Sequence, residues 1–285
     1  MFYENINVYI YYAIKFARLD HVTQRAELYQ KGFMLLESFY LITFAMVMEF
    51  VDSALGMMYG TVLSPLLILL GYDVKTVVPS ILISQSIGGF IASWRHHRLG
   101  NANFQTGTVD YRVTTTIIWF GVFACLLGVF VSSSISPKIL NTYIAVLVIV
   151  IGVMILWGKT LIMTSKKIYA LGFISAFNKA LSGGGFGPLV AGGQLVFKDR
   201  CEKGAIGSTD FAEAPICLLS FFLWVLLNGM PTLSLMAPLC LGSAVGGFFG
   251  PFALSKLGSK ELLKKGLGAL VLVEGMWVIY KVWLR

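Results

Sequence analysis

A chain of 285 residues with 57% hydrophobic and 13% charged side chains has more apolar surface than a soluble domain of this size can bury. Its mean hydropathy of +0.79 places it among integral membrane proteins. The formal net charge of +8 comes from Lys and Arg in short loops between apolar runs, which is the pattern of a membrane topology signal and excludes a nucleic-acid-binding class.

Apolar runs of membrane-spanning length recur from residue 32 to the end of the chain. A spanning helix needs about 20 apolar residues, and only helices or closed barrels satisfy their backbone groups in lipid. The alternating pattern of barrel strands is not evident, so we predict an all-α integral membrane protein, a polytopic helical bundle. The expected segments are residues 32–51, 55–70, 76–94, 113–133, 138–157, 168–181, 183–197, 204–227, 233–254 and 262–283.

The segments divide the chain into four regions. Residues 1–31 mix aromatic and charged residues, which favours an amphipathic arm on the membrane surface. We expect a first transmembrane repeat over 32–158, a basic cytoplasmic linker over 159–167 and a second repeat over 168–285. The four cysteines show no Cys-x-x-Cys pairing, so neither a metal site nor a cofactor is predicted.

One pattern occurs in both halves: a glycine, an aromatic residue and a second glycine within an apolar run. It is formed by Gly56, Tyr59 and Gly60, and again by Gly183, Phe186 and Gly187. Lys75 and Ser80 recur as Lys203 and Ser208, an offset of 128 residues, which supports an internal duplication. Five segments per half place the second repeat in inverted orientation, and basic loops alternate with nearly neutral ones as this topology requires.

Short segments accompany these glycine patterns. Segments 168–181 and 183–197 have 14 and 15 residues, fewer than a full span needs. Each repeat is therefore predicted to contain a Gly-rich broken or re-entrant helical hairpin, which gives six spans and two hairpins; ten short crossings are the alternative.

A helix interrupted within the membrane is a natural anion site. It presents unpaired N–H groups and the positive end of its dipole where little water competes. Gly183, Gly184 and Gly185 could wrap an oxyanion with main-chain donors. Gly56 and Gly60, taken alone, could simply allow close helix packing.

Acidic side chains within the apolar runs are few, and each is costly at membrane depth unless it faces a cavity or a partner. The expected ion-coupling acids are Glu49, Asp52, Asp210 and Glu213. Asp210 and Glu213 lie three residues apart, hence on one face of a helix. A carboxyl group shielded from water holds its proton more tightly, which suits a proton carrier.

The candidate substrate ligands lie at or near the two breaks. Lys179 is either the counter-charge of an anion or the buried partner of one of the acids, and both interpretations stay open. By the same 128-residue offset, Gln85 corresponds to Glu213. The predicted substrate-binding residues are Gly56, Gly60, Gln85, Asn178, Lys179, Ser182, Gly183, Gly184 and Gly185.

Two histidines, His96 and His97, adjoin Arg95 and Arg98. We interpret them as cytoplasmic loop charge, in preference to metal ligands. The chain contains no Walker motif, Gly-x-Ser-x-Gly or His-Glu-x-x-His. These motifs would indicate ATP hydrolysis or a familiar hydrolytic centre, so no enzymatic activity is expected.

The arrangement of a Gly-rich turn, an apolar helix with Pro or Ser, a short polar link and a helix opening with small residues resembles the sulfite exporter TauE/SafE family, also called the TSUP family. The matching stretches are Gly56-Met57-Met58-Tyr59-Gly60 through Ser64-Pro65 with Val78-Pro79-Ser80, and Gly183-Gly184-Gly185-Phe186-Gly187-Pro188 with Gly207-Ser208. The resemblance covers residues 35–283, and the first copy lacks the triple glycine. It implies a multi-pass permease of the cell membrane for sulfur-containing anions such as sulfite, sulfonates or sulfoacetate, powered by an ion gradient.

These features together predict a secondary active transporter with an inverted repeat, in which the two glycine-tipped hairpins meet at the midplane and bind one oxyanion. Lys179 and backbone N–H groups would attract the anion, while Asp210 or Glu213 would exchange a proton or another ion. The orienting side chains would be Ser182, Asn178 and Gln85. The expected partners are a small inorganic or organic sulfur-containing anion, protons or Na+ and membrane lipid, without nucleic acid; assembly into a homo-oligomer stays open.

The main rival hypothesis is a cation transporter or channel. It would use as ligands the four embedded acids Glu49, Asp52, Asp210 and Glu213. Further alternatives are a membrane enzyme or assembly factor, for which no nucleophile and base are recognisable, and a sensor that transports nothing.

Overall fold

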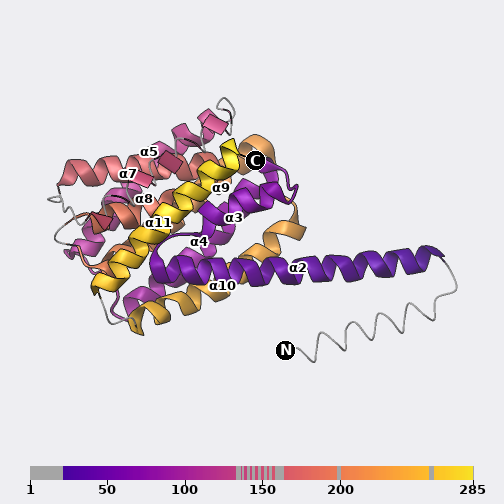
Figure 1. Ribbon diagram of the computed structural model, residues 1–285, viewed down its shortest axis with the longest axis horizontal. Coiled ribbons are helices and arrows are strands. Elements are labelled where there is room, and N and C mark those ends of the chain that lie inside the picture. The colour runs from indigo at the N-terminus through magenta and orange to yellow at the C-terminus, as the bar shows by residue number, and fades with distance from the viewer. Residues whose placement is uncertain are drawn as a thin grey trace.

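The computed structural model describes residues 22–132, 164–197, 200–256 and 260–284, with single positions between 136 and 157. All elements in these ranges are helices (Figure 1). They are α2 (Val22–Leu55), α3 (Tyr59–Leu69), α4 (Val74–Arg98), α5 (Val109–Ser132), α7 (Ser165–Ser182), α8 (Phe186–Leu195), α9 (Glu202–Asn228), α10 (Leu233–Lys256) and α11 (Lys260–Trp283). The predicted all-α class is confirmed.

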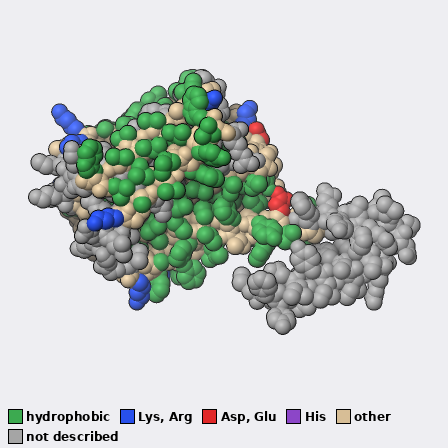
Figure 2. Space-filling model, viewed as in Figure 1, with side chains coloured by type: hydrophobic (Ala, Val, Ile, Leu, Met, Phe, Trp, Pro, Cys, Tyr) green, Lys and Arg blue, Asp and Glu red, His purple; other side chains and the backbone are tan. Residues whose placement is uncertain are grey.

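Five helices in the described ranges are long and apolar enough to cross a membrane. The stretches are Met34–Leu55, Val74–Arg98, Val109–Val131, Glu202–Asn228 and Leu233–Lys256. Large apolar side chains such as Trp119, Phe130 and Leu226 are exposed, and Figure 2 shows hydrophobic side chains over most of the visible face, with Lys and Arg near its margins. An apolar surface of this extent suits contact with lipid, and the chain is a multi-pass membrane protein.

Two of the helices are much shorter than a span. α3 has 11 residues and α8 has 10, which correspond to about 16 Å and 15 Å at the rise of an α-helix. Because the hydrocarbon core is about 30 Å thick, neither helix can cross it alone. The predicted helix breaks lie immediately before α3 and α8, whereas the choice between six spans with two hairpins and ten short crossings stays a prediction.

The first helix is longer than its predicted segment. α2 runs through 34 residues from Val22 without a break, and Figure 1 shows it extending beyond the body of the molecule. Residues 22–31, predicted as part of a separate arm, belong to this helix. Residues 1–21 lie outside the described residues, as do most of segment 138–157 and linker 159–167.

The packing of the second half repeats that of the first. α2 packs on α10 as α7 packs on α5, α4 packs on α10 as α9 packs on α5, and α4 and α9 pack on each other. Exchanging α2, α4 and α5 with α7, α9 and α10 therefore reproduces these pairs of packed helices. This exchange supports the duplication, and the inverted orientation of the repeats stays a prediction.

Two apolar cores occupy corresponding positions around the α4–α9 contact. Phe186, the first residue of α8, is buried in the core that joins α8 to α5, α7 and α9. Tyr59, the first residue of α3, is buried in the core that joins α3 to α2, α4 and α10. These two aromatic residues of the repeated pattern thus anchor the helices that follow the breaks.

Candidate functional site

The first helix break, residues 56–58 between α2 and α3, lies against the second, residues 183–185 between α7 and α8. A Cβ atom on Gly60 would overlap the carbonyl oxygen of Gly183, and one on Gly184 would lie 2.9 Å from the carbonyl oxygen of Gly60. On the other side, a Cβ on Gly187 would lie 2.5 Å from the carbonyl oxygen of Gly56. The backbones approach this closely only because glycines face each other, and the predicted meeting of the two breaks is confirmed.

The breaks also share their backbone geometry. Gly56 and Gly183 have φ angles of 80° and 74°, and two residues later Met58 and Gly185 have φ angles of 119° and 79°. Positive φ is costly for a side chain with a Cβ, and Met58 is the one non-glycine with positive φ among the described residues. The first break therefore has backbone strain at Met58, where the second break has a glycine, Gly185.

Main-chain donors of the second break already have partners. The N–H of Gly184 donates to the hydroxyl of Ser182 at 3.2 Å, and that of Gly185 donates to the hydroxyl of Thr61 at 3.2 Å. Gly183 ends α7, with its N–H bonded to a carbonyl of the preceding turn. Two of the three predicted anion donors thus bond to hydroxyl groups, which can rotate away.

Lys179 lies at the contact of the two breaks, in the last turn of α7 and 1% exposed. Its Nζ lies 2.7 Å from Oε1 of Glu213 and donates to Oε1 of Gln85. A Cβ on Gly60 would lie 2.8 Å from this Nζ. Gln85 and Glu213, paired by the offset between the repeats, therefore converge on one lysine. Of the two interpretations of Lys179, this structure displays the buried ion pair.

Gln85 extends this network to Asp52. Its Nε2 donates to Oδ2 of Asp52 at 3.3 Å, while Oδ1 of Asp52 accepts the backbone N–H of Tyr59 at 2.8 Å. Because Tyr59 begins α3, Asp52 places a carboxylate on the positive end of that helix. The hydroxyl of Tyr59 donates to Ser84 at 2.7 Å, so the first break is also tied to α4.

Several buried polar atoms among the described residues have no hydrogen-bond partner. Both amide atoms of Asn178, Oε2 of Glu49 and Oδ1 of Asp210 are in this state. Asn178 is fully buried and adjoins Lys179 in the chain. Because buried polar groups are nearly always paired, these unpaired atoms make the three side chains candidates for contact with a ligand.

The position of His96 corrects the interpretation of both histidines as loop charge. His96 is fully buried, and its Nε2 lies 3.0 Å from Oδ2 of Asp210 and 3.0 Å from the carbonyl oxygen of Ser53. His97 is exposed and stacks on Phe104. Loop charge therefore describes His97, whereas His96 belongs to the buried cluster.

The buried cluster holds four carboxyl groups and one lysine. Glu49, Asp52, Asp210 and Glu213 are each 4% exposed or less, and the Lys179 ammonium pairs with Glu213. An uncompensated buried charge costs several kcal/mol, so the acids in excess must hold protons or bind cations. Among the described residues, no group of three or more His, Cys, Asp and Glu side chains has an arrangement that could hold a metal ion.

Comparison with known proteins identifies the family. A family model described as Sulfite exporter TauE/SafE matches residues 41–278. The chain belongs to this family. This chain is 24% identical over 245 residues to the "Probable membrane transporter protein YtnM" of Bacillus subtilis (strain 168), a match that covers 73% of this chain and 79% of that protein. No solved structure matches the chain.

Membership makes the protein a membrane transporter of the TauE/SafE type. The family model spans α3 and α8 and both breaks between helices. All of the site residues named from the sequence, from Glu49 to Glu213, fall within the matched range.

A second buried network, centred on Arg200, was not predicted from the sequence. Arg200, 8% exposed, donates from Nη1 to Oδ1 of Asp110 at 2.7 Å, from Nε to Oε1 of Gln194 at 3.0 Å and from Nη2 to Ser208 at 3.0 Å. Arg200 lies between α8 and α9. The network ties the start of α5 to the end of α8 and the beginning of α9.

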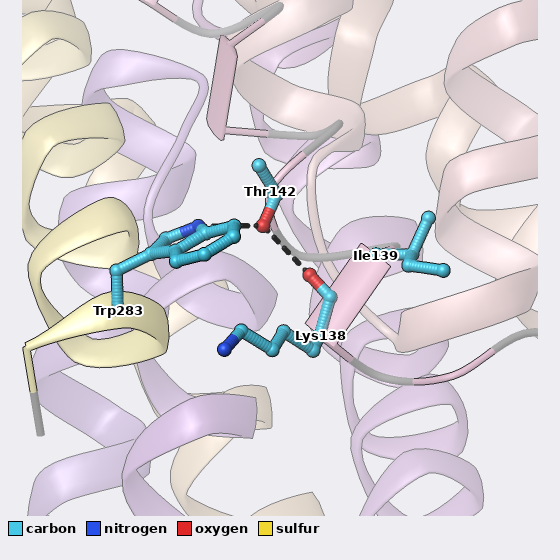
Figure 3. Close-up of a pocket in the computed structure, with 4 residues that line it drawn as sticks. All are labelled: Lys138, Ile139, Thr142 and Trp283. Atoms are coloured by element: carbon cyan, nitrogen blue, oxygen red, sulfur yellow. Dashed lines mark hydrogen bonds between the residues drawn. The ribbon is translucent and has the colours of Figure 1, made fainter.

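A surface pocket of about 340 Å³ lies away from both networks. Its lining residues are Lys138, Ile139, Thr142 and Trp283 (Figure 3). The indole N–H of Trp283 donates to Thr142 at 3.0 Å, and Nζ of Lys138 lies 4.2 Å from the centre of the Trp283 ring. None of the predicted site residues lines this pocket.

Proposed function

We propose that the protein is a secondary active transporter that carries a small sulfur-containing oxyanion, such as sulfite, a sulfonate or sulfoacetate, across the cell membrane. The observation that carries this proposal is the buried ammonium of Lys179 at the contact of the two helix breaks. A buried cation attracts an anion strongly because little water screens it. The family description adds sulfite as the substrate to test first.

In the proposed bound state, the anion replaces Glu213 as the partner of Lys179. Asn178 precedes Lys179 in the chain and its buried amide has no partner, so it would orient the oxyanion together with the hydroxyl of Ser182 and the amide of Gln85. When the hydroxyl groups that bind Gly184 and Gly185 rotate away, their N–H groups become additional donors. Gly56 and Gly60 contribute by letting the breaks close around the anion.

The same four acids would couple transport to an ion gradient. An anion bound at Lys179 takes the place of Glu213 beside the ammonium, so Glu213 loses its positive partner. The cluster then becomes more negative, and a proton or Na+ binds more readily. Glu49, Asp52, Asp210 and Glu213 are the groups that can respond. Alternating access requires that the two touching breaks separate toward one side of the membrane and then toward the other.

A second function, cation transport, is favoured by one observation. The four carboxyl groups outnumber the lysine, and Glu49 and Asp210 each present an oxygen without a partner. A cation transporter of this kind would conduct or exchange Na+ or another cation without sulfite, and divalent metals would inhibit it.

Counterflow in proteoliposomes tests the proposal. Vesicles loaded with unlabelled sulfite should accumulate radiolabelled sulfite, and Lys179→Met should abolish the exchange. Lys166→Met is a matched control, because Lys166 lies on the same helix but is exposed. Exchange by Lys179→Met at the wild-type rate would overturn the proposed site, and cation flux that ignores sulfite would support the second function.

A further inference from the structure

His96 lies between the buried acids and one end of the helical bundle. It is in the last turn of α4, next to exposed His97 and Arg98. One ring nitrogen faces Asp210, and the other faces Asn101 in the loop that follows the helix. The proposed anion site does not use His96, Asn101 or Asp210 as a substrate ligand.

The hydrogen bonds fix which nitrogen of His96 carries the hydrogen. Nδ2 of Asn101 lies 2.9 Å from the carbonyl oxygen of Pro251, which can only accept, so the NH2 group of the amide must be on that side. The same Nδ2 lies 3.1 Å from Nδ1 of His96 and donates to it. Nδ1 therefore has no hydrogen, and the neutral ring carries its hydrogen on Nε2.

That single N–H faces more acceptors than it can satisfy. Nε2 lies 3.0 Å from both Oδ2 of Asp210 and the carbonyl oxygen of Ser53. Oδ1 of Asp210 and Oε2 of Glu49 have no partner, and the Ser53 hydroxyl supplies Oε1 of Glu49 at 3.3 Å. Because acceptors outnumber hydrogens here, one additional proton would relieve the deficit.

The other two acids are already supplied with donors. Glu213 is paired with Lys179 at 2.7 Å, and Asp52 accepts hydrogen bonds on both of its oxygens, from Tyr59 and Gln85. Neither acid has a buried oxygen without a partner in the described structure. Asp210 and Glu49 are thus the acids with room for a proton.

Charged groups face the His96–Asp210 pair from several elements. Glu49 and Asp52 on α2 and Glu213 on α9 are close enough to repel the Asp210 carboxylate. Lys179 on α7 acts on it through Glu213, and α10 contributes the carbonyl of Pro251 through Asn101. The charged groups around Asp210 are therefore mostly negative.

We infer that Asp210, held by the Nε2–H of His96, is the site that binds the coupling proton, with Glu49 as its neighbouring acceptor. This inference rests on the proposed anion transport and names its coupling ion. One O–H bond forms on the Asp210 carboxylate with a proton taken from water on one side of the membrane, and the same bond breaks when that proton is released on the other side. His96 stays neutral and acts as a positioning residue.

Proton binding at Asp210 is linked to anion binding at Lys179. The anion adds negative charge to the cluster and the proton removes it, so each ligand strengthens the binding of the other. The expected transport mode is therefore symport of anion and proton. Before the anion binds, Asp52 and Glu213 hold Gln85 and Lys179 in place.

The test uses proteoliposomes containing the full chain, with labelled sulfite outside and a pH indicator trapped inside. Wild-type vesicles should accumulate sulfite when a pH gradient is imposed and should acidify as sulfite enters. Asp210→Asn should lower the number of protons that enter per anion by about tenfold or more, while some sulfite exchange remains measurable.

Substitutions at His96 separate positioning from a purely structural role. His96→Phe removes the donor to Asp210, so the carboxyl group should keep its proton at higher pH. The midpoint of the pH profile of accumulation should then rise by about one to two units, the equivalent of one charge-assisted hydrogen bond. His96→Gln retains an N–H donor and should stay closer to wild type, and His97→Phe, at the exposed neighbour, should not shift the profile.

The outcomes distinguish this inference from the proposed function. Sulfite exchange without acidification, or accumulation driven by Na+ alone, would overturn the inference and leave anion transport intact. Retention of proton coupling by Asp210→Asn, or an unshifted profile in a folded His96→Phe protein, would also overturn it. Absence of sulfite exchange in wild-type vesicles would overturn the proposed function and the inference together.

Discussion

Nζ of Lys179 and Oε1 of Glu213 lie 2.7 Å apart at the place where the two helix breaks meet. The pair joins α7 to α9 across 34 residues of sequence, and both side chains are almost fully buried. Each charge is stable there because of the other, so a ligand that separates them must replace one of them. An oxyanion can do so at Lys179, and a proton can neutralise an acid that is left behind.

Removing one member of this pair should cost more stability than removing both. Lys179→Met or Glu213→Met alone leaves an uncompensated buried charge and should destabilise the protein by about 3–5 kcal/mol, whereas the double Met variant should be nearly neutral. Thermal unfolding in detergent measures the difference, with Lys166→Met as the exposed control. A double variant as unstable as either single one would show that the pair is not a self-contained unit.

Gly60→Ala should separate the two breaks. Its Cβ would overlap the carbonyl oxygen of Gly183, a backbone atom that cannot rotate away. We expect loss of sulfite counterflow and a lower melting temperature. Gly32→Ala is the control, because a Cβ on Gly32 of α2 meets nothing within 4 Å and alanine favours a helix. Wild-type transport by Gly60→Ala would mean that close contact of the breaks is not required.

The Met58→Gly protein should be more stable than the Met58→Ala protein. Its φ of 119° is unfavourable for any residue with a Cβ, and Gly185, its counterpart in the second break, is a glycine with φ of 79°. Met58→Ala loses side-chain packing but keeps the strain, whereas Met58→Gly loses both. We expect Met58→Gly to exceed Met58→Ala in stability by about 1 kcal/mol. Equal stability of the two variants would show that the break relaxes without strain.

Arg200→Lys should destabilise the protein nearly as much as Arg200→Ala. The guanidinium donates to Gln194, Asp110 and Ser208 at the same time, and a lysine ammonium cannot reproduce this fork. The unmatched Asp110 carboxylate then loses its 2.7 Å ion pair, and we expect a loss of about 2–4 kcal/mol in both variants. A melting temperature of Arg200→Lys close to wild type would contradict this.

The fold and the meeting of the breaks could be predicted because they depend on composition and on local sequence. The apolar runs give the helices, and the glycines at 56, 60, 183 and 187 mark both interruptions and permit their contact. The register between the repeats also placed Gln85 and Glu213 in equivalent positions, and both reach Lys179.

The roles of His96 and Arg200 could not be predicted because they depend on contacts between distant parts of the chain. His96 meets Asp210 across 114 residues, and Arg200 meets Asp110 across 90. Both histidines lie between two arginines in the sequence, and only the packing of α4 against α9 and α10 distinguishes the buried one. The spacing of Asp210 and Glu213 predicted a shared helix face but not that one pairs with His96 and the other with Lys179.

Equilibrium binding of radiolabelled sulfite to the purified protein tests the central claim most directly. Wild type and Lys166→Met should bind sulfite saturably and with the same affinity. The double variant Lys179→Met, Glu213→Met, which should remain folded, is expected to bind at least about tenfold more weakly, a loss of about 1.4 kcal/mol or more. Wild-type affinity in the folded double variant would contradict an anion site at Lys179.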